Sequence, residues 1–354
     1  MEFAWFPLKS CAQLRRPPSP LPIDPDELWL STAAMIQTPH SAPRLVPTLV
    51  SIVIPCFNSA RWIAAAVSSA LDQTWPATEV IVVDDGSSDE SPAKLRAFGD
   101  RVTFIETPHR GGNNARNAGL AVARGEWVQF LDADDYLEPA KVGQQLAETA
   151  DGATADVIYS PVWVEKEEAG RTSRSAPAID GRLDLFAQWL TWQLPQTGGA
   201  LWRKAALETL GGWKEGQPCC QEHELYLRAL QAGLRFRFAP TPHAVYRLWS
   251  EDTVCRRDPR QVIRIRTELM DRLQAWMTEH ALWTPGHTRA AGQAFFEMAR
   301  TLARYDLAGA EAYFHDRKTR GLIHLAGPAA PRSYRLAQRL LGFTTAEKIA
   351  AARR

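Results

Sequence analysis

The sequence has few cysteines, and they form no pattern that would organise the structure. There are five among 354 residues, an odd number, and Cys219 and Cys220 are adjacent, which does not suit an ordinary disulfide framework. No CxxC pair accompanies histidines in the spacing of a zinc site. These absences argue against a disulfide-rich secreted domain and a structural zinc domain. We therefore expect a reducing, cytosolic compartment.

Long apolar runs are also missing. No stretch of 18 or more apolar residues is present to form a membrane-spanning helix, and the N-terminus lacks an apolar region followed by a cleavage site. Hydrophobic content of 45% and charged content of 23% are those of an ordinary globular protein. We expect a cytoplasmic protein with no secretory signal.

The net charge is small, at +1, but it is unevenly distributed. From residue 256 to the end the sequence has about 18 Lys and Arg against about nine Asp and Glu, so the remainder is acidic. The basic residues are scattered along the helical pattern, which argues against a nucleic-acid partner. A basic tail could contact anionic lipid or an acidic partner, or it could be a solvated helix surface.

Residues 1–47 are rich in proline and lack apolar periodicity, so we predict a disordered leader there. A start at Met35 would remove most of it. Ordered structure is expected over 48–255, with a nucleotide-binding half at 48–150 and an acceptor half at 151–255. Residues 256–354 are expected to form a helical C-terminal region.

Strands and helices alternate regularly between residues 49 and 135. Apolar runs at 49–58, 78–85, 101–108 and 127–135 are typical of buried strands, and helical patterns follow the first three, the first of them with Asn58 or Ser59 as its cap. This alternation predicts an α/β fold with a Rossmann-type, mostly parallel sheet flanked by helices. After residue 150 the pattern weakens to a possible hairpin, two helices and short strands.

Acidic side chains follow two of the predicted strands. Asp84 and Asp85 end the second, and Asp132, Asp134 and Asp135 follow the fourth in "VQFLDADDYLEP". Parallel strands end at one edge of a sheet, which is where ligands bind. Clustered carboxylates repel each other and suit a hard divalent cation such as Mg²⁺ or Mn²⁺.

The sequence has neither of the glycine-rich loops that hold phosphates directly. No GxxxxGK(S/T) or GxGxxG pattern is present. A divalent ion held by one or two carboxylates usually also binds substrate phosphates. The pattern therefore predicts a phosphate-bearing ligand that is held mainly through the metal.

Four motifs follow one another in the order and spacing of family 2 glycosyltransferases: "VSIVIPCFN", "VIVVDDGSSDES", "GGNNARNAGL" and "WVQFLDADDYLEP". The sequence resembles this family over about residues 49–250. The resemblance implies a GT-A fold and an inverting enzyme that uses a nucleotide-activated sugar.

The resemblance also implies roles for the strand ends. Pro55, Phe57 and Asn58 would lie beside the base and ribose, and Asp85 would accept from a base N–H. Arg116 would reach the base or the diphosphate; without the motif, it would be taken for a surface arginine paired with an acid.

The same resemblance assigns the metal. Asp132 would face the ribose or the metal, and Asp134 would bind the metal, Mn²⁺ or Mg²⁺, that bridges the diphosphate. Such a cation stabilises the charge that the leaving group gains.

An inverting transfer also needs a base for the acceptor hydroxyl. Aligned on "LYLR", the segment "CCQEHELYLRA" places Glu222 at the position of the family's catalytic Asp, with Gln221 in place of the preceding Glu. Glu222 is the predicted base; the alternative is a first-turn residue favoured by the helix dipole. Glu224 is expected to be structural. A further departure is Trp249, where many relatives have a histidine near the metal.

These observations predict an inverting, metal-dependent glycosyltransferase, with a UDP-sugar as donor and a glycan or lipid-linked sugar as acceptor. Cell-surface polysaccharide or glycolipid synthesis is the expected context, with possible peripheral contact at the inner membrane face through the basic C-terminal helices. The alternatives are a nucleotidyltransferase that makes a sugar nucleotide, and a non-catalytic sugar-nucleotide-binding protein on the same scaffold.

Overall fold

The first two apolar runs form adjacent strands at the centre of a sheet. In the computed structural model, which describes residues 47–149, 154–168, 171–248 and 258–352, β1 (Val50–Cys56) pairs in parallel with β2 (Thr78–Asp84). Their residues are almost all buried, because helices cover both faces of the sheet. The expected Rossmann-type arrangement is confirmed.

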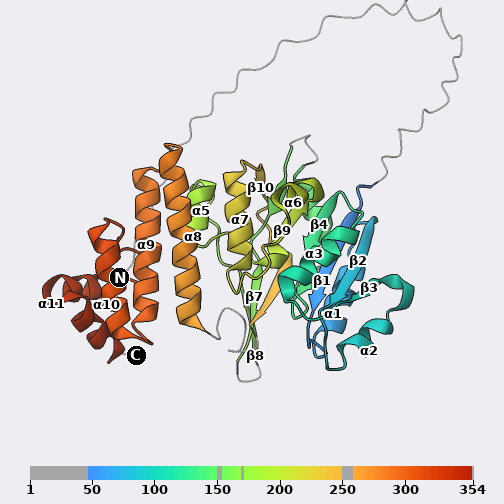
Figure 1. Ribbon diagram of the computed structural model, residues 1–354, viewed down its shortest axis with the longest axis horizontal. Coiled ribbons are helices and arrows are strands. Elements are labelled where there is room, and N and C mark those ends of the chain that lie inside the picture. Colours follow the sequence, from blue (N-terminus) through green and yellow to red (C-terminus); the bar gives the residue numbers. More distant parts are fainter. Residues whose placement is uncertain (1–46, 150–153, 169–170, 249–257, 353–354) are drawn as a thin grey trace, which may run out of the picture. The chain divides into compact units, whose positions relative to one another are not determined.

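The remaining elements of this half alternate as the sequence predicts. They are α1 (Ile63–Leu71), α2 (Ser91–Arg96), β3 (Thr103–Glu106), α3 (Gly112–Val122) and β4 (Trp127–Phe130) (Figure 1). The predicted cap of α1 is wrong, since Trp62 holds the N-cap position and no side chain caps it. The Asn58 side chain instead accepts from the backbone N–H of Ser88, and Ser59 contributes only its carbonyl to the first turn.

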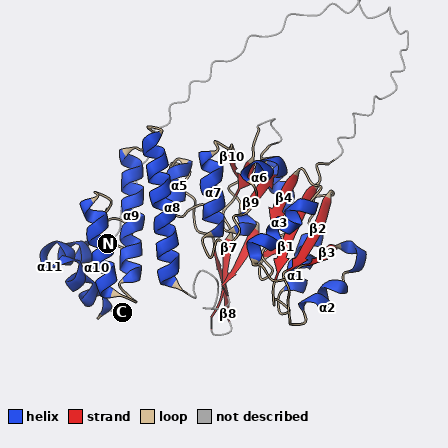
Figure 2. Ribbon diagram, viewed as in Figure 1, coloured by secondary structure: helices blue, strands red, loops and turns tan. Residues whose placement is uncertain are grey.

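Alternate residues of β1 divide between two cores. Ile52 and Ile54 pack with α1, whereas Val53 lies in the cluster that includes the α3 residues Ala115 and Leu120. The side-chain period of two therefore places α1 and α3 on opposite faces of the sheet. Figure 2 shows the resulting layers, with the strands enclosed between helices.

The complete main sheet has seven strands in the order β10-β6-β9-β4-β1-β2-β3. The acceptor half supplies β6 (Val157–Tyr159), β9 (Ala200–Arg203) and β10 (Phe236–Phe238). Strand β9 is antiparallel to both β4 and β6, and the other pairs are parallel. The sheet is thus mostly parallel, with one reversed strand next to β4.

A second sheet, which the sequence does not predict, has the order β5-β11-β7-β8. Its members are β5 (Tyr136–Leu137), β7 (Trp163–Glu168), β8 (Arg171–Ser175) and β11 (Ala244–Leu248). The antiparallel pair β7 and β8 confirms the expected hairpin. Strand β5 is only two residues long and follows the acidic turn, so this sheet begins beside the clustered carboxylates.

Four further helices support the strands: α4 (Lys141–Ala147), α5 (Leu185–Leu190), α6 (Lys204–Leu210) and α7 (Gln221–Gln231). A 3-10 turn, η2 (Thr197–Gly199), leads directly into β9. Helix α6 ends at Gly211, which adopts the left-handed conformation that favours glycine.

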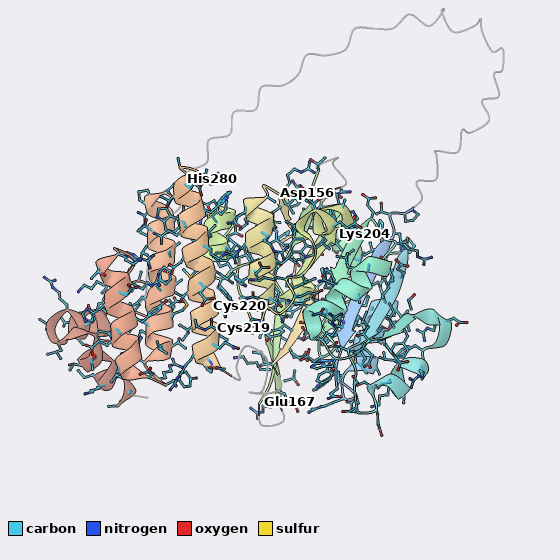
Figure 3. The ribbon with its side chains drawn as sticks, in the orientation of Figure 1. Asp156, Glu167, Lys204, Cys219, Cys220 and His280 are labelled. Atoms are coloured by element: carbon cyan, nitrogen blue, oxygen red, sulfur yellow. The ribbon has the colours of Figure 1, made fainter. Side chains whose placement is uncertain are left out.

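The C-terminal region is helical, as expected. It consists of α8 (Pro259–Glu279), α9 (Pro285–Leu302), α10 (Leu307–Thr319) and α11 (Arg332–Ala351), which is kinked at Gly342. Helix α8 packs on α7, α9 on α5, and α11 on α10, and the cluster that contains α7 continues into α8 and α9 (Figure 3). The helical region therefore shares a core with the sheet.

Three expectations fall outside the described residues: most of the proposed leader with Met35, the boundary near 255, and Trp249. The proposed division into domains therefore stays a prediction. Within the described ranges, no helix is both long enough and apolar enough to cross a membrane.

Candidate functional site

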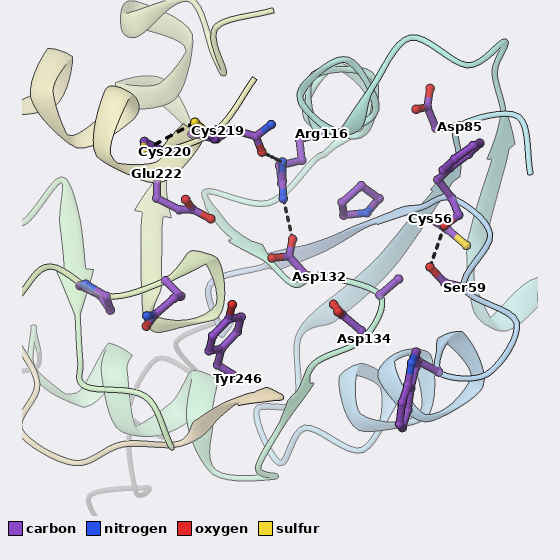
Figure 4. A pocket seen from close by; sticks show the side chains of 18 of the residues that line it. Cys56, Ser59, Asp85, Arg116, Asp132, Asp134, Cys219, Cys220, Glu222 and Tyr246 are labelled. Carbon is purple, nitrogen blue, oxygen red and sulfur yellow. Dashed lines mark hydrogen bonds and ion pairs between the residues drawn. The ribbon is translucent and has the colours of Figure 1, made fainter. Parts of the chain in front are cut away.

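A cavity of about 670 Å³ opens at the edge of the sheet where β1 and β4 end. Every residue that the sequence singles out for catalysis or binding lines it: Pro55, Phe57, Asn58, Asp85, Arg116, Asp132, Asp134 and Glu222. The structure thus brings together residues that are up to 167 positions apart in the chain. In Figure 4, Glu222 and Asp85 lie on opposite sides, with Arg116, Asp132 and Asp134 between them.

The donor end of the cavity, defined here as the loops after β1 and β2, carries an exposed aromatic side chain. Phe57 is 44% exposed and stacks on His109, with ring centroids 4.0 Å apart. Beside it, Asn58 holds a positive φ of 46°, and its side-chain oxygen accepts from the backbone N–H of Ser88 at 2.8 Å. The two loops are therefore tied to each other, leaving an aromatic face open to a planar ligand.

Asp85 is buried at this end and already has protein donors. Its two carboxylate oxygens accept from the backbone N–H groups of Arg110 and Gly111, both at 2.8 Å. His109 Nδ1 lies 2.9 Å from one of them. The carboxylate is thus held rigidly, and a ligand N–H would have to use a remaining lone pair.

Arg116 lies at the middle of the cavity, almost fully buried. It donates from Nη2 to Asp132 Oδ1 at 2.6 Å and from Nη1 to Gln221 Oε1 at 3.0 Å, and its guanidinium lies over the Trp213 ring. The alternative interpretation of Arg116 as a surface arginine is wrong. The residue pairs with an acid, but it does so inside the site, where it joins the acidic turn after β4 to the first residue of α7.

The acidic turn contains one fully buried carboxylate. Asp135 accepts from the backbone N–H of Arg247 at 2.8 Å, and Arg247 Nη1 donates to the carbonyl of Asp134 at 3.2 Å. Burial first, and then the charges of Asp134 and Asp132, raise the pKa of Asp135 well above its usual range. The turn therefore concentrates negative charge that a cation would relieve.

The donor set fits a divalent ion that is completed by substrate oxygens. Asp132 and Asp134 both line the cavity, but one oxygen of Asp132 is engaged by Arg116. Across the described ranges, no group of three or more His, Cys, Asp and Glu side chains is placed to hold a metal. Two carboxylates alone suit Mg²⁺ or Mn²⁺ bound jointly with a diphosphate, and do not suit an all-protein cage.

The opposite end of the cavity, called the base end because it contains the predicted base Glu222, is formed by α7 and by residues 192–197. Glu222, in the first turn of α7, accepts from the Thr197 hydroxyl, with Oγ1 and Oε1 2.6 Å apart. Glu224, in contrast, is buried and ion-paired with Arg228 at 2.9 Å, away from the cavity lining. The geometry agrees with the expectation that Glu224 is structural, and leaves Glu222 as the α7 carboxylate that faces the cavity.

His223 packs against an aromatic ring at the cavity wall. Its ring stacks on Trp192 with centroids 3.2 Å apart and also lines the cavity. Burial, together with the charge of Arg266, holds the pKa of His223 well below its usual range, so the ring is neutral. Trp192 has an unfavourable φ of 62° for a residue with a side chain, and this stack helps to hold it there.

Two adjacent thiols, Cys219 and Cys220, come shortly before Glu222 in the chain (Figure 3). Cys219 and Cys220 are buried, line the cavity and have their sulfurs 3.9 Å apart. The hydrogen bond from Cys220 lowers the pKa of the Cys219 thiol, whereas burial raises that of Cys56, at the end of β1, to about 11. Among the described residues, none of these three cysteines forms a disulfide.

Sequence reasoning misses the part of the lining that comes from the acceptor half. It includes Trp192, Leu194, Pro195, Gln196, Cys219, Cys220 and Tyr246, together with Arg61 and Trp62 from the loop after β1. Thr197, which contacts Glu222, is missed as well. The sequence has 13 tryptophans, a large number for its length, but this count does not distinguish a cavity wall from a core residue.

Comparison with known proteins agrees with this geometry. The pattern of the family described as Glycosyl transferase family 2 matches residues 51–211. The succinoglycan biosynthesis protein ExoO of Rhizobium meliloti (strain 1021) is 43% identical over 150 residues, which are 42% of this chain and 39% of that protein. ExoU, a second succinoglycan biosynthesis protein of that organism, is 32% identical over 209 residues, 54% of this chain and 59% of ExoU. The chain thus aligns with less than two thirds of either relative.

Among solved structures, S. aureus TarS 1-349 in complex with UDP-GlcNAc is similar, with a TM-score of 0.60 and 18% identity. The match covers 85% of this chain and 88% of that one. At this identity the likeness shows the fold alone, which is GT-A-like.

Proposed function

We propose that the chain is an inverting glycosyltransferase, since residues 51–211 match the pattern of glycosyl transferase family 2. It moves a sugar from a nucleotide diphosphate donor, a UDP-sugar, to a hydroxyl group of a glycan or a lipid-linked sugar. The proposed context is the synthesis of a cell-surface polysaccharide or glycolipid. ExoO and ExoU, whose names place them in succinoglycan biosynthesis, support the polysaccharide context.

One observation carries the proposal: a single cavity contains a carboxylate on one side and the acidic turn with Arg116 on the other. A transfer reaction needs these two ends to face one space, because the acceptor oxygen must approach the sugar carbon from the side opposite the leaving group. Glu222 is the proposed base, and Pro55, Phe57, Asn58 and Asp85 are the proposed nucleoside contacts.

In the proposed step, the acceptor oxygen forms a bond to the sugar C1 as the bond from C1 to the diphosphate oxygen breaks. The hydroxyl proton goes to Glu222, and the electron pair of the broken bond leaves with UDP, so the configuration at C1 inverts. Arg116 keeps a buried positive charge beside Asp132, where the diphosphate would lie. This charge opposes the negative charge that develops on the leaving group.

Asp134, with the remaining oxygen of Asp132, would hold the Mn²⁺ or Mg²⁺ ion. When bound, such an ion supplies electrostatic stabilisation to the departing diphosphate. Asp135 lies behind this pair, hydrogen-bonded to the backbone of Arg247, and fixes the shape of the turn.

We place the enzyme in the cytoplasm, with peripheral contact to the inner membrane face through α11. Leu336, Leu340 and Leu341 are 60%, 70% and 53% exposed. Exposed arginines lie beside them on the same helix: Arg332, Arg335 and Arg339. An apolar ridge flanked by cations suits the surface of an anionic bilayer. Sedimentation with vesicles at low salt tests this, and equal binding to neutral and anionic vesicles contradicts it.

Donor screening tests the activity. Release of nucleoside diphosphate is measured from UDP-glucose, UDP-galactose, UDP-GlcNAc and GDP-mannose with Mn²⁺, using water and simple sugars as acceptors. Turnover of a UDP-sugar that is lost in Glu222→Gln supports the proposal. Pyrophosphate exchange with a sugar phosphate would instead indicate a nucleotidyltransferase, and UDP binding without any turnover would indicate a binding protein.

A further inference from the structure

The contact between Thr197 and Glu222 joins two segments that are 25 residues apart in sequence. Thr197 is only 3% exposed, and its hydroxyl donates to Oε1 over 2.6 Å. This distance is in the range of a hydrogen bond between a hydroxyl and an ionised carboxylate. We propose that Thr197 is a positioning residue that holds Oε1 of Glu222 and leaves Oε2 to take the acceptor proton; this rests on the proposed role of Glu222 as base.

Thr197 can position Glu222 because the core holds its own backbone. Thr197 is the first residue of η2, and the carbonyls of the next two residues accept from buried glutamines. Gln129 Nε2 donates to the Gly198 carbonyl at 3.1 Å, and Gln145 Nε2 donates to the Gly199 carbonyl at 2.9 Å. These glutamines come from β4 and α4, so the turn is attached to the main sheet on one side and to a helix on the other.

Close packing also prevents the turn from shifting. A Cβ atom at Gly199 would lie 2.4 Å from Pro195 Cβ and 2.9 Å from the Ser160 carbonyl. The Ser160 N–H donates to the Gly199 carbonyl at 3.0 Å. These contacts fix the position of the Thr197 hydroxyl, and none of them involves α7, the helix that carries Glu222.

In the described part of the chain, the Thr197 hydroxyl is the only hydrogen-bond donor to the Glu222 carboxylate. The neighbouring Gln221 side chain accepts from Arg116 and donates to the Gln217 carbonyl. The His223 ring stacks on Trp192. Without the hydroxyl, the Glu222 side chain could rotate about its own bonds while α7 stays in place. Loss of the hydroxyl should therefore affect the chemical step and leave donor binding unchanged.

The first test uses Thr197→Val, which keeps the shape of the side chain and removes its hydroxyl. With the UDP-sugar that is active in the donor screen, kcat should fall by about 10²-fold, the cost of misplacing a catalytic group. The Kd for UDP with Mn²⁺ should stay within about twofold. Thr197→Ser should recover most of the loss, since it retains the hydroxyl. Thr267→Val, which removes another buried hydroxyl that bonds to Tyr313, is the matched control and should keep wild-type kcat.

A split between kcat and donor affinity separates positioning from a general structural effect, because a loosened fold would impair both, whereas a misplaced Glu222 would lower kcat alone.

The double variant Thr197→Val/Glu222→Gln distinguishes the two proposals. If Thr197 acts only through Glu222, the double variant should be no slower than Glu222→Gln alone. Full turnover by Glu222→Gln would overturn the proposed base, whereas a slow Glu222→Gln beside a wild-type Thr197→Val would overturn the positioning role alone. Should Thr197→Val fail to fold, Thr197→Ala replaces it, and wild-type kcat in that variant also overturns the proposal.

Discussion

The two ends of the cavity are built in different ways. At the donor end, Asp85 is held by backbone N–H groups of the loop after the next strand. At the base end, Glu222 is held by a side-chain hydroxyl on a turn that is itself fixed by buried amides. In the proposed function, donor binding thus depends on loops at the ends of parallel strands, whereas placement of the base depends on a few specific side-chain contacts. A substitution at one end of the cavity should therefore impair the function of that end and leave the other end unchanged.

The largest effect is expected from Glu222→Gln, which breaks the base end alone. It preserves shape but cannot accept a proton, so kcat should fall by about 10²–10⁴-fold. The affinity for UDP, measured by titration calorimetry with Mn²⁺, should barely change. Glu222→Asp should keep partial activity, because the carboxylate remains but is about one methylene short.

Glu224→Gln is the control for this variant. It breaks the ion pair with Arg228 and should lower the melting temperature while sparing kcat. A Glu222→Gln enzyme with wild-type turnover at saturating donor would exclude Glu222 as base and leave the cavity without a candidate on α7.

The complementary variant is Asp134→Ala, which changes the acidic turn and not the base end. It should abolish the Mn²⁺-dependent part of UDP binding, and with it the thermal stabilisation, about 2.7 kcal/mol at 100 times Kd. The fold should stay intact, because removal of one carboxylate relieves the repulsion on Asp135. Asp72→Ala, an exposed acid at the end of α1, is the control. UDP binding that keeps its affinity and metal dependence in Asp134→Ala would disprove the metal assignment.

These predictions also mark what the sequence can and cannot supply. The alternation of strands and helices and the polar strand ends are local patterns, so β1 to β4 and the donor end were predictable. The reversal of β9, the second sheet and the contact between Thr197 and Glu222 depend on pairing between distant segments. The apolar periodicity within a single segment does not predict such pairings. The cap of α1 failed for a related reason, since Asn58 bonds to a loop about 30 residues away instead of to its own helix.

A smaller effect, on stability, is expected at Lys141. This residue lies in the same helix as Gln145, which supports the turn that carries Thr197. Lys141 begins α4, one turn before Gln145, and its amine is fully buried with no hydrogen-bond partner in the described ranges. Burial lowers the pKa of Lys141 well below its usual range. Between that lowered value and about 10.4 the unfolded chain binds more protons, so the free energy of unfolding rises with pH.

Lys141→Met should therefore stabilise the fold by about 1–3 kcal/mol near neutral pH, with little change in kcat. The gain should shrink as the pH rises toward about 10.4, where the amine is neutral in both states. Urea unfolding at several pH values measures this, with the exposed Lys318→Met as the control. A loss of stability that does not depend on pH would mean that the amine has a partner.

The smallest effect is expected from removal of residues 1–34. That segment has no periodic apolar face, so its loss should change neither the melting temperature nor the activity at either end of the cavity. Differential scanning calorimetry and the donor assay check this together. A fall of many degrees would show that the segment packs on the rest of the chain.

The reversed direction of β9 has a consequence for redesign. Because β9 runs against β4, it begins at the edge where β4 ends, so the segment before it reaches the cavity without a crossover. Residues 192–196, between α5 and η2, are the part of this segment that lines the cavity, so substitutions there change the cavity wall without altering β1 to β4. For the proposed transferase, they would be a direct way to change the acceptor while the donor stays the same.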